Sequence, residues 1–236
     1  MTKPAKPYSK HRPHGLTILH EDQDIIVINK SSGLLTMGTD RDKSHTAHSI
    51  LNDYVRKGSA RSRNRVYIVH RLDRVTSGVL VFAKNEEAKR YLQDNWEDTE
   101  KKYLAVVHGR VSPPEGTIRT YLAENSALVV YSTSDRAKGK LAVTSYRTVK
   151  EANGLSLLEI DLLTGRKHQI RVHLAEKGNP VAGDQKYGKK GDRCSRLALH
   201  AYSIAFTHPF TGEQLFFEAE PPDFFKRLMG NFVPRK

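Results

Sequence analysis

The chain has 236 residues, of which 39 are lysine or arginine and 26 are aspartate or glutamate, so its formal net charge is +13 with histidine neutral. With 38% hydrophobic residues, 16 glycines and 10 prolines, the composition excludes collagen-like and globally disordered chains. No apolar run approaches the roughly 18 residues of a membrane span. The excess positive charge indicates a polyanionic partner, for which RNA, DNA and an anionic lipid surface are the candidates.

Residues 1–15 contain four basic residues, three prolines and no acid, which predicts a flexible basic arm. We expect one domain over residues 16–236, because no linker-like stretch divides the rest of the chain. The chain has one cysteine, Cys194, which excludes an internal disulfide. Since the N-terminus also lacks the apolar stretch of a secretory signal, we predict a cytoplasmic protein.

In chain order, the apolar pattern first predicts a β-hairpin, with strands at 16–20 and 25–30 around turn residues 21–24. A helix over 46–57, a basic loop at 61–65, a short strand at 66–69 and a second helix over about 86–99 follow. Further strand-like segments lie at 103–108, 127–131, 142–149, 155–163, 197–206 and 214–218. Because strands outnumber helices and mostly follow one another directly, we predict an α+β fold with a largely antiparallel mixed sheet flanked by helices.

Two familiar kinds of binding motif fail on inspection. Segment 183–190 almost spells a phosphate-binding loop, but Lys190 stands where serine or threonine must bind magnesium. His168 and His173 are five residues apart rather than on one helical face, and the lone cysteine has no CxxC partner. We therefore predict neither a nucleotide-binding loop nor a metal site.

Two other segments are rich in chemically active side chains. Residues 68–82 read IVHRLDRVTSGVLVF, so Asp73 lies among cations beside a Thr-Ser-Gly turn between two apolar strands. The ordinary interpretation is a turn aspartate that pairs with Arg71 or Arg74. Residues 163–174 read LTGRKHQIRVHL, which predicts a turn and then a helix whose cations suit phosphate contact or the ordering of a buried carboxylate.

Together these two segments resemble the RluA-type RNA pseudouridine synthases. The family's HRLDxxTSG motif stands at residues 70–78 and its TGRxHQIRxHL motif at 164–174, and the second motif is followed by similar residues at 178–184 and 187–188. Shorter matches lie in order at 28–34, 102–105 and 197–201. The resemblance spans about residues 16–220. It departs from the family at Ser31, where relatives usually have proline. We also expect no S4-like RNA-binding module of the kind many relatives carry, since some fifteen residues precede the first predicted strand.

The resemblance implies the pseudouridine synthase fold with a central RNA-binding cleft. It also implies an isomerase that converts uridines of structured RNA into pseudouridine without a cofactor. Residue by residue, the match assigns the catalytic carboxylate to Asp73 and its guanidinium partner to Arg171. It assigns to Tyr103 the stacking on the extruded base, and Tyr103 is also the candidate to remove the C5 proton. Whether Asp73 attacks covalently or removes a ribose proton stays open.

For RNA binding, the match assigns to Arg71 the space that a flipped uridine leaves in the base stack. Arg74, Arg166 and His168 are expected to contact RNA from within the two motifs. Two basic runs are expected to line opposite rims of the cleft. The first basic run contains Arg56, Lys57, Arg61, Arg63 and Arg65, and the second basic run contains Lys186, Lys189, Lys190, Arg193 and Arg196.

We expect large-subunit ribosomal RNA of the 23S type to be the substrate, with tRNA as the alternative within the same family. A catalytically silent RNA-binding relative is a further alternative, which the presence of Asp73, Tyr103 and Arg171 disfavours. A DNA-acting glycosylase fits the charge but has no matching motif. The expected protein is a monomer that binds RNA, with no membrane and no obligate protein partner.

Overall fold

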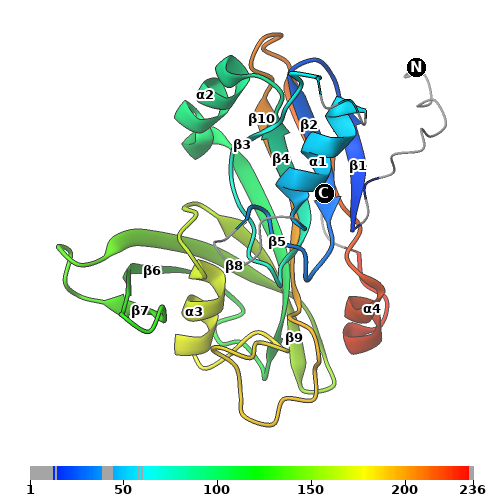
Figure 1. Cartoon of the computed structure of the whole chain (residues 1–236). Coiled ribbons are helices and arrows are strands. Elements are labelled where there is room, and N and C mark those ends of the chain that lie inside the picture. The colour runs from blue at the N-terminus through cyan, green and yellow to red at the C-terminus, as the bar shows by residue number, and fades with distance from the viewer. Residues whose placement is uncertain (1–12, 14, 39–44, 58, 60, 234–236) are drawn as a thin grey trace.

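The computed structural model describes residue 13 and residues 15–38, 45–57, 59 and 61–233 (Figure 1). Apart from residues 13 and 15, the predicted arm over 1–15 lies outside the described residues, so the division into arm and domain stays a prediction. In the part of the chain that is described, no helix is long and apolar enough to cross a membrane.

One sheet of eleven strands runs through the molecule. The strands are β1 (Leu16–Glu21), β2 (Ile25–Lys30), β3 (Tyr67–Ile68), β4 (Ser77–Ala83), β5 (Glu100–His108), β6 (Glu115–Glu124), β7 (Val130–Thr133), β8 (Lys140–Ala152), β9 (Leu155–Leu162), β10 (Leu199–Thr207) and β11 (Gln214–Glu218). The helices are α1 (Ala47–Arg56), α2 (Glu86–Asp94), the 3-10 helix η1 (Trp96–Asp98), α3 (Gln169–Glu176) and α4 (Asp223–Met229).

The strand order is β1-β2-β4-β10-β5-β9-β8-β6-β7, with β11 added to β10 and β3 to β4. The pairing of β4 with β10 is parallel, and every other pairing between these strands is antiparallel. The predicted α+β class with a largely antiparallel mixed sheet is therefore confirmed.

The central strands β2 and β4 are buried on both faces, which explains why their sequences are continuous apolar runs rather than alternating ones. On one face, Ile26 and Ile28 of β2 belong to the same buried cluster as Leu51 of α1. On the other face, Val27 shares a cluster with Leu92 of α2. The helices thus cover opposite faces of this half of the sheet.

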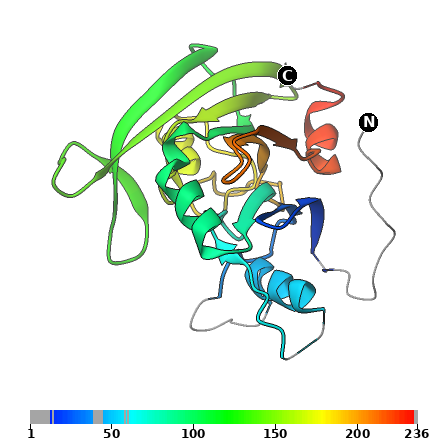
Figure 2. The same cartoon turned by 90° about the horizontal axis from the view of Figure 1, so that it is seen from above.

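Beyond β9, the strands β6, β7 and β8 extend from the body as a curved ribbon (Figures 1 and 2). Helix α3 packs against this ribbon through Val172, which shares a buried cluster with Leu122, Val130 and Ala142. This packing fixes the position of α3, and α3 carries most of the second motif.

The sequence predicts neither β6 nor α4. Most side chains of β6 are exposed or half-buried, so its apolar residues form no clear alternating pattern. Strand β7 occupies 130–133 rather than 127–131, because the Asn125 side chain accepts the backbone amides of Ala127 and Val129, both at 3.0 Å, and closes a turn there. The helix predicted over 86–99 is divided into α2 and η1.

Candidate active site

The loop that carries Asp73 is attached to the segment that follows β2. The hydroxyl of Thr36 donates to the carbonyl of Leu72 (2.9 Å) and accepts from the amide of the same residue (3.2 Å). The amide of Gly33 donates to the carbonyl of Arg74 (2.7 Å). Backbone groups on both sides of Asp73 are therefore held in place before any substrate arrives.

Ser77 and Gly78 of the Thr-Ser-Gly segment after Asp73 begin β4, and the glycine has a steric reason. Gly78 has a φ of +118°, and a Cβ there would lie 2.1 Å from the carbonyl oxygen of Ala201 in β10. The hydroxyl of Ser77 donates to Nδ1 of buried His200 (2.8 Å), whose Nε2 donates to a backbone carbonyl (2.9 Å). These contacts join β4 to β10 directly behind the loop.

A buried lysine lies behind the same loop. Lys30 is fully buried, and its Nζ donates to the carbonyls of Leu34 (2.8 Å), Ser31 (3.1 Å) and Arg74 (3.4 Å). Burial lowers the pKa of Lys30 to about 7, and the negative charge of Asp73 opposes this shift. Lys30 therefore links the segment after β2, through the carbonyls of Ser31 and Leu34, to the Asp73 loop, through the carbonyl of Arg74, and it interacts electrostatically with Asp73.

From the other side of the cleft, α3 and the turn before it bring the side chains of Arg171 and His168 to Asp73. Nη1 of Arg171 donates to Oδ2 of Asp73 at 3.1 Å, and Nε2 of His168 lies 3.7 Å from the same oxygen. The other oxygen, Oδ1, accepts no hydrogen bond from any described residue. Burial lowers the pKa of His168, an effect that Asp73 opposes and Arg171 reinforces.

Tyr103 of β5 reaches the same cleft, in register with Ala201 of β10 and Ile160 of β9. Burial raises the pKa of the Tyr103 phenol above its ordinary value, and the negative charge of Asp73 raises it further. The phenol is therefore protonated at neutral pH.

The structure thus places the three predicted catalytic residues together in one cleft of about 440 Å³, a volume typical of small-molecule sites. The four predicted RNA contacts within the motifs also line this cleft: Arg71, Arg74, Arg166 and His168.

All four residues also contact the surrounding protein, His168 through the hydroxyl of Tyr187 at 2.8 Å. Arg74 donates to the carbonyl of Gly33 (3.0 Å) and Arg166 to that of Leu141 (2.9 Å). Arg71 is exposed, and among the described residues its side chain has one hydrogen-bonding contact, at 3.6 Å to the sulfur of Met37.

The two basic runs lie outside the cleft lining. Arg61, Arg63 and Arg65 of the first run and Lys189 and Lys190 of the second are exposed. Arg56 and Arg65 line a separate hollow of about 340 Å³ beside α1. Their predicted contact with RNA at the rims stays a prediction.

The site also contains residues to which the sequence analysis gave no role. His70 packs on Trp96 with ring centroids 4.4 Å apart and accepts the amide of Val81 (3.1 Å). Burial, with a smaller contribution from the charge of Lys101, lowers the pKa of His70 to about 3, so this ring is neutral. Lys101 and Trp96 both line the cleft. Asp184, buried against Arg171, is a further member of the site.

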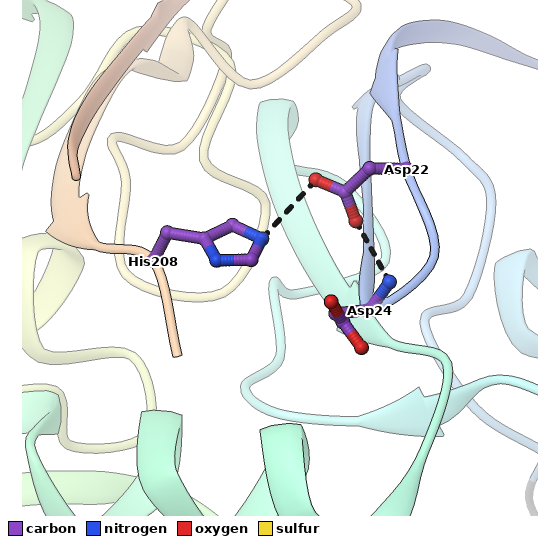
Figure 3. Close-up of side chains that lie close together, drawn as sticks. All are labelled: Asp22, Asp24 and His208. Carbon is purple, nitrogen blue, oxygen red and sulfur yellow. Dashed lines mark hydrogen bonds and ion pairs between the residues drawn. The ribbon is translucent and has the colours of Figure 1, made fainter. Parts of the chain in front are cut away.

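One group of side chains in the described part of the chain has the spacing of a possible metal site. Donor atoms of Asp22, Asp24 and His208 lie within 4.8 Å of one another (Figure 3). Asp22 already accepts hydrogen bonds from His20 (2.8 Å), His208 (3.3 Å) and the amide of Asp24 (2.8 Å). The group does not line the cleft, and the predicted absence of a metal stays a prediction.

Comparisons with known proteins agree with this geometry. A family model described as RNA pseudouridylate synthase matches residues 24–176, which include both motifs. The chain is 37% identical over 226 residues to the Uncharacterized RNA pseudouridine synthase YlyB of Bacillus subtilis, covering 93% of this chain and 73% of that protein. It is 36% identical over 226 residues to the Ribosomal large subunit pseudouridine synthase D of Neisseria meningitidis, covering 89% of this chain and 59% of the relative.

Among solved structures, Human RNA Pseudouridylate Synthase Domain Containing 4 matches with a TM-score of 0.73 and 25% identity, over 88% of this chain and 89% of its own. The predicted pseudouridine synthase fold is thereby confirmed. With the family model spanning more than half of the chain, the protein belongs to the RluA-type family of RNA pseudouridine synthases, which are isomerases.

Proposed function

We propose that this pseudouridine synthase acts on uridines of large-subunit ribosomal RNA. The proposal is supported by the 36% identity to the Neisseria relative, whose name specifies the large ribosomal subunit. The match covers 89% of this chain but 59% of that relative. A tRNA substrate is the alternative, because the cleft residues act on a single nucleoside and do not distinguish one RNA from another.

The catalytic assignment is carried by the contact between Asp73 and Arg171. A guanidinium 3.1 Å from Oδ2 stabilises the charged carboxylate, and Oδ1 remains without a donor from the described residues. Asp73 is thus an oriented carboxylate with one oxygen available to a substrate. We infer that it is the group that acts on the nucleoside.

In the covalent route of the proposed reaction, Asp73 attacks C1′ and displaces N1, the base turns, and C5 then displaces Asp73 from C1′. In the alternative route, Asp73 removes a ribose proton as the C1′–N1 bond breaks, and the proton returns to the sugar as the C1′–C5 bond forms. In both routes C5 then loses its proton and N1 gains one. Uridine and pseudouridine are isomers, so the reaction consumes no oxidant, reductant or cofactor.

Tyr103 is proposed to stack on the extruded base. Its ring is buried at the cleft wall, and its raised pKa keeps the phenol neutral in the resting site. A neutral ring face suits stacking on a uracil. Removal of the C5 proton by Tyr103 requires the phenolate, which burial and the nearby Asp73 charge disfavour, so stacking is the better supported of the two roles.

A uridine inside a stack is out of reach of Asp73 and has to be flipped out. Arg71 is exposed at the cleft and bound to its surroundings through one long contact, so it is free to move into the vacated space. Arg74, Arg166 and His168 surround the same opening and are proposed to contact the RNA backbone.

We also propose that the protein is a cytoplasmic monomer. Size-exclusion chromatography tests the oligomeric state.

The activity is tested with RNA tritiated at uridine C5. When C5 becomes bonded to C1′ it loses its hydrogen, so the tritium is released to water. Transcripts of large-subunit ribosomal RNA are expected to release tritium with the wild-type protein. Release from tRNA transcripts alone would replace the ribosomal proposal by the tRNA alternative. No release from either class or from total cellular RNA would overturn the proposed function.

The target is tested independently by mapping pseudouridines in cellular RNA with and without this protein. We expect one or a few large-subunit positions to lose their pseudouridine when the protein is absent. If every difference lies in tRNA, the ribosomal assignment is wrong.

A further inference from the structure

Arg171 is held by a carboxylate other than the one it activates. Its Nε and Nη2 donate to Oδ2 and Oδ1 of Asp184, both at 2.8 Å, while Nη1 donates to Asp73 at 3.1 Å. A two-bond fork fixes the orientation of a planar guanidinium within its plane. The direction in which Nη1 faces Asp73 is therefore set by Asp184.

Asp184 is itself fixed by the turn in which it lies. Its Oδ1 also accepts the backbone amides of Lys186 (2.9 Å) and Tyr187 (3.0 Å). The two glycines of the turn are sterically required: a Cβ on Gly183 would lie 1.9 Å from a backbone oxygen, and one on Gly188 would lie 2.1 Å from the carbonyl oxygen of Asp184. We call residues 183–188 the positioning loop.

Burial alone would raise the pKa of Asp184, but the hydrogen bonds and charge of Arg171, together with the two amides, outweigh burial and lower it. Asp184 is thus a charged, fully engaged carboxylate with a side chain that is 1% exposed. It lies too deep to contact RNA.

Tyr187 of the same loop contacts both Arg171 and His168, the two side chains that face Asp73. Its ring lies beneath the guanidinium of Arg171, with Cζ 5.2 Å from the ring centroid, which restrains the tilt of the guanidinium plane. Its hydroxyl is 2.8 Å from Nδ1 of His168 and accepts the amide of Val130 (3.1 Å). The loop therefore supports Arg171 and His168 together.

We propose that Asp184 and Tyr187 are positioning residues for catalysis, which set the geometry of the Asp73 carboxylate through Arg171 and His168. This inference rests on the proposed role of Asp73. A positioning role differs from a purely structural one because it lowers kcat while leaving RNA binding intact. Misplacement of a reacting group by about 1 Å can cost on the order of a hundredfold in rate.

The variants Asp184→Asn and Tyr187→Phe test the two contacts separately. Asparagine keeps the shape of Asp184 but places an N–H group against one of the two N–H donors of Arg171, which breaks the fork. Phenylalanine keeps the ring under Arg171 and removes the link to His168. We expect kcat to fall roughly ten- to hundredfold for Asp184→Asn and severalfold for Tyr187→Phe, with KM and the Kd for RNA within about twofold of wild type.

Matched controls come from buried groups outside the cleft. Glu159 is a 5% exposed carboxylate paired with Arg147 at 2.8 Å, so Glu159→Gln shows the general cost of neutralising a buried carboxylate. Tyr146 is buried and its hydroxyl donates to a carbonyl at 3.3 Å, so Tyr146→Phe shows the cost of losing a buried hydroxyl. Urea unfolding of each variant ensures that the kinetics are measured on folded protein.

A crystal structure of each positioning variant gives a second readout that does not depend on turnover. In Asp184→Asn we expect the Arg171–Asp73 contact to lengthen from 3.1 Å to beyond hydrogen-bonding distance. An unchanged contact, a kcat within twofold of wild type, or losses that the controls reproduce would overturn the inference. If the wild type turns over no RNA, the proposed function fails, and the crystal structure alone decides whether the loop positions Arg171.

Discussion

Arg171 and Arg63 carry the same charge in opposite settings. Arg171 is buried and bound to two carboxylates, whereas Arg63, in the first basic run, is exposed and forms no hydrogen bond or ion pair with any described residue. The first arrangement fixes an angle and a distance, which matter for a reacting group. The second provides a positive charge that is not held in one position, which suits attraction of a phosphate backbone. We therefore expect buried charges to control rate and stability, and exposed ones to control RNA affinity.

Among the variants that test this comparison, the largest effect is expected from Arg171→Lys. A lysine carries the charge but cannot form the fork, so Asp184 loses a bidentate partner and Asp73 loses its oriented donor. We expect kcat to fall by about a hundredfold or more, and the free energy of unfolding to fall by about 3–5 kcal/mol. Single-turnover kinetics and urea unfolding measure the two quantities.

Arg147→Lys is the control for this variant, because Arg147 also pairs with a buried carboxylate but lies outside the cleft lining. It is expected to lower stability without lowering kcat. Equal losses of kcat in the two variants would contradict the claim that the buried pair of Arg171 and Asp184 controls the rate.

Buried histidines are expected to make stability depend on pH. Burial lowers the pKa of His173 and of His200 from 6.5 to about 4. Between these values the unfolded chain binds protons that the folded chain does not. The free energy of unfolding is therefore highest above pH 6.5 and falls as the pH drops towards 4, by on the order of 3 kcal/mol for each histidine.

Urea unfolding at several pH values between 7 and 4 measures this slope. His200→Gln is expected to show a shallower slope than wild type. The control His45→Gln, at an exposed histidine, is expected to show the wild-type slope. A stability that does not change over this range would contradict the account of the buried histidines.

Lys30→Met is expected to have the next largest effect. It leaves the carbonyls of Leu34, Ser31 and Arg74 without this donor, at a cost of about 1–3 kcal/mol in the free energy of unfolding. Because one of these carbonyls belongs to the loop of Asp73, kcat should also fall. The exposed Lys226 provides the control Lys226→Met, and a Lys30 variant as stable and active as this control would contradict the assignment.

The smallest effect per residue is expected from the first basic run. Replacing Arg61, Arg63 and Arg65 one at a time by glutamine should weaken RNA binding a few-fold each. Each replacement that removes a phosphate contact should reduce the slope of log affinity against log salt by about 0.7–0.9, with kcat unchanged. Filter binding over a range of salt concentrations measures the RNA affinity and its salt slope. A salt slope that stays at the wild-type value in the triple variant would remove this run from the RNA-binding surface.

Much of the sheet could be predicted from the sequence, because a strand buried on two faces needs a continuous apolar run, as in 25–28 and 79–83. β6 could not be predicted in this way, since the ribbon leaves most of its side chains partly exposed and only its pairing with β7 and β8 defines it. Local sequence shows apolar faces, whereas pairing between distant strands is a property of the whole fold.

The site shows the same limit. The motif match identified Asp73 and Arg171, which are 98 positions apart in the chain, but spacing alone would not have paired them. Lys30 and Asp184 lie in polar stretches that read as surface, and only the tertiary structure buries them. Gly183-Asp184 and Tyr187-Gly188 match the family, but the match gives no physical reason for the aspartate. The structure supplies one, because Asp184 accepts two hydrogen bonds from the guanidinium of Arg171.

The most direct test of the whole account is to measure RNA binding and pseudouridine formation for Asp73→Asn on the same RNA. The exposed Asp94 of α2 provides the matched control Asp94→Asn. We predict that Asp73→Asn binds the RNA with an affinity close to that of wild type and forms no pseudouridine, while Asp94→Asn is fully active. Pseudouridine formation by Asp73→Asn at the wild-type rate would contradict the claim that the half-buried Asp73 carboxylate performs the chemistry.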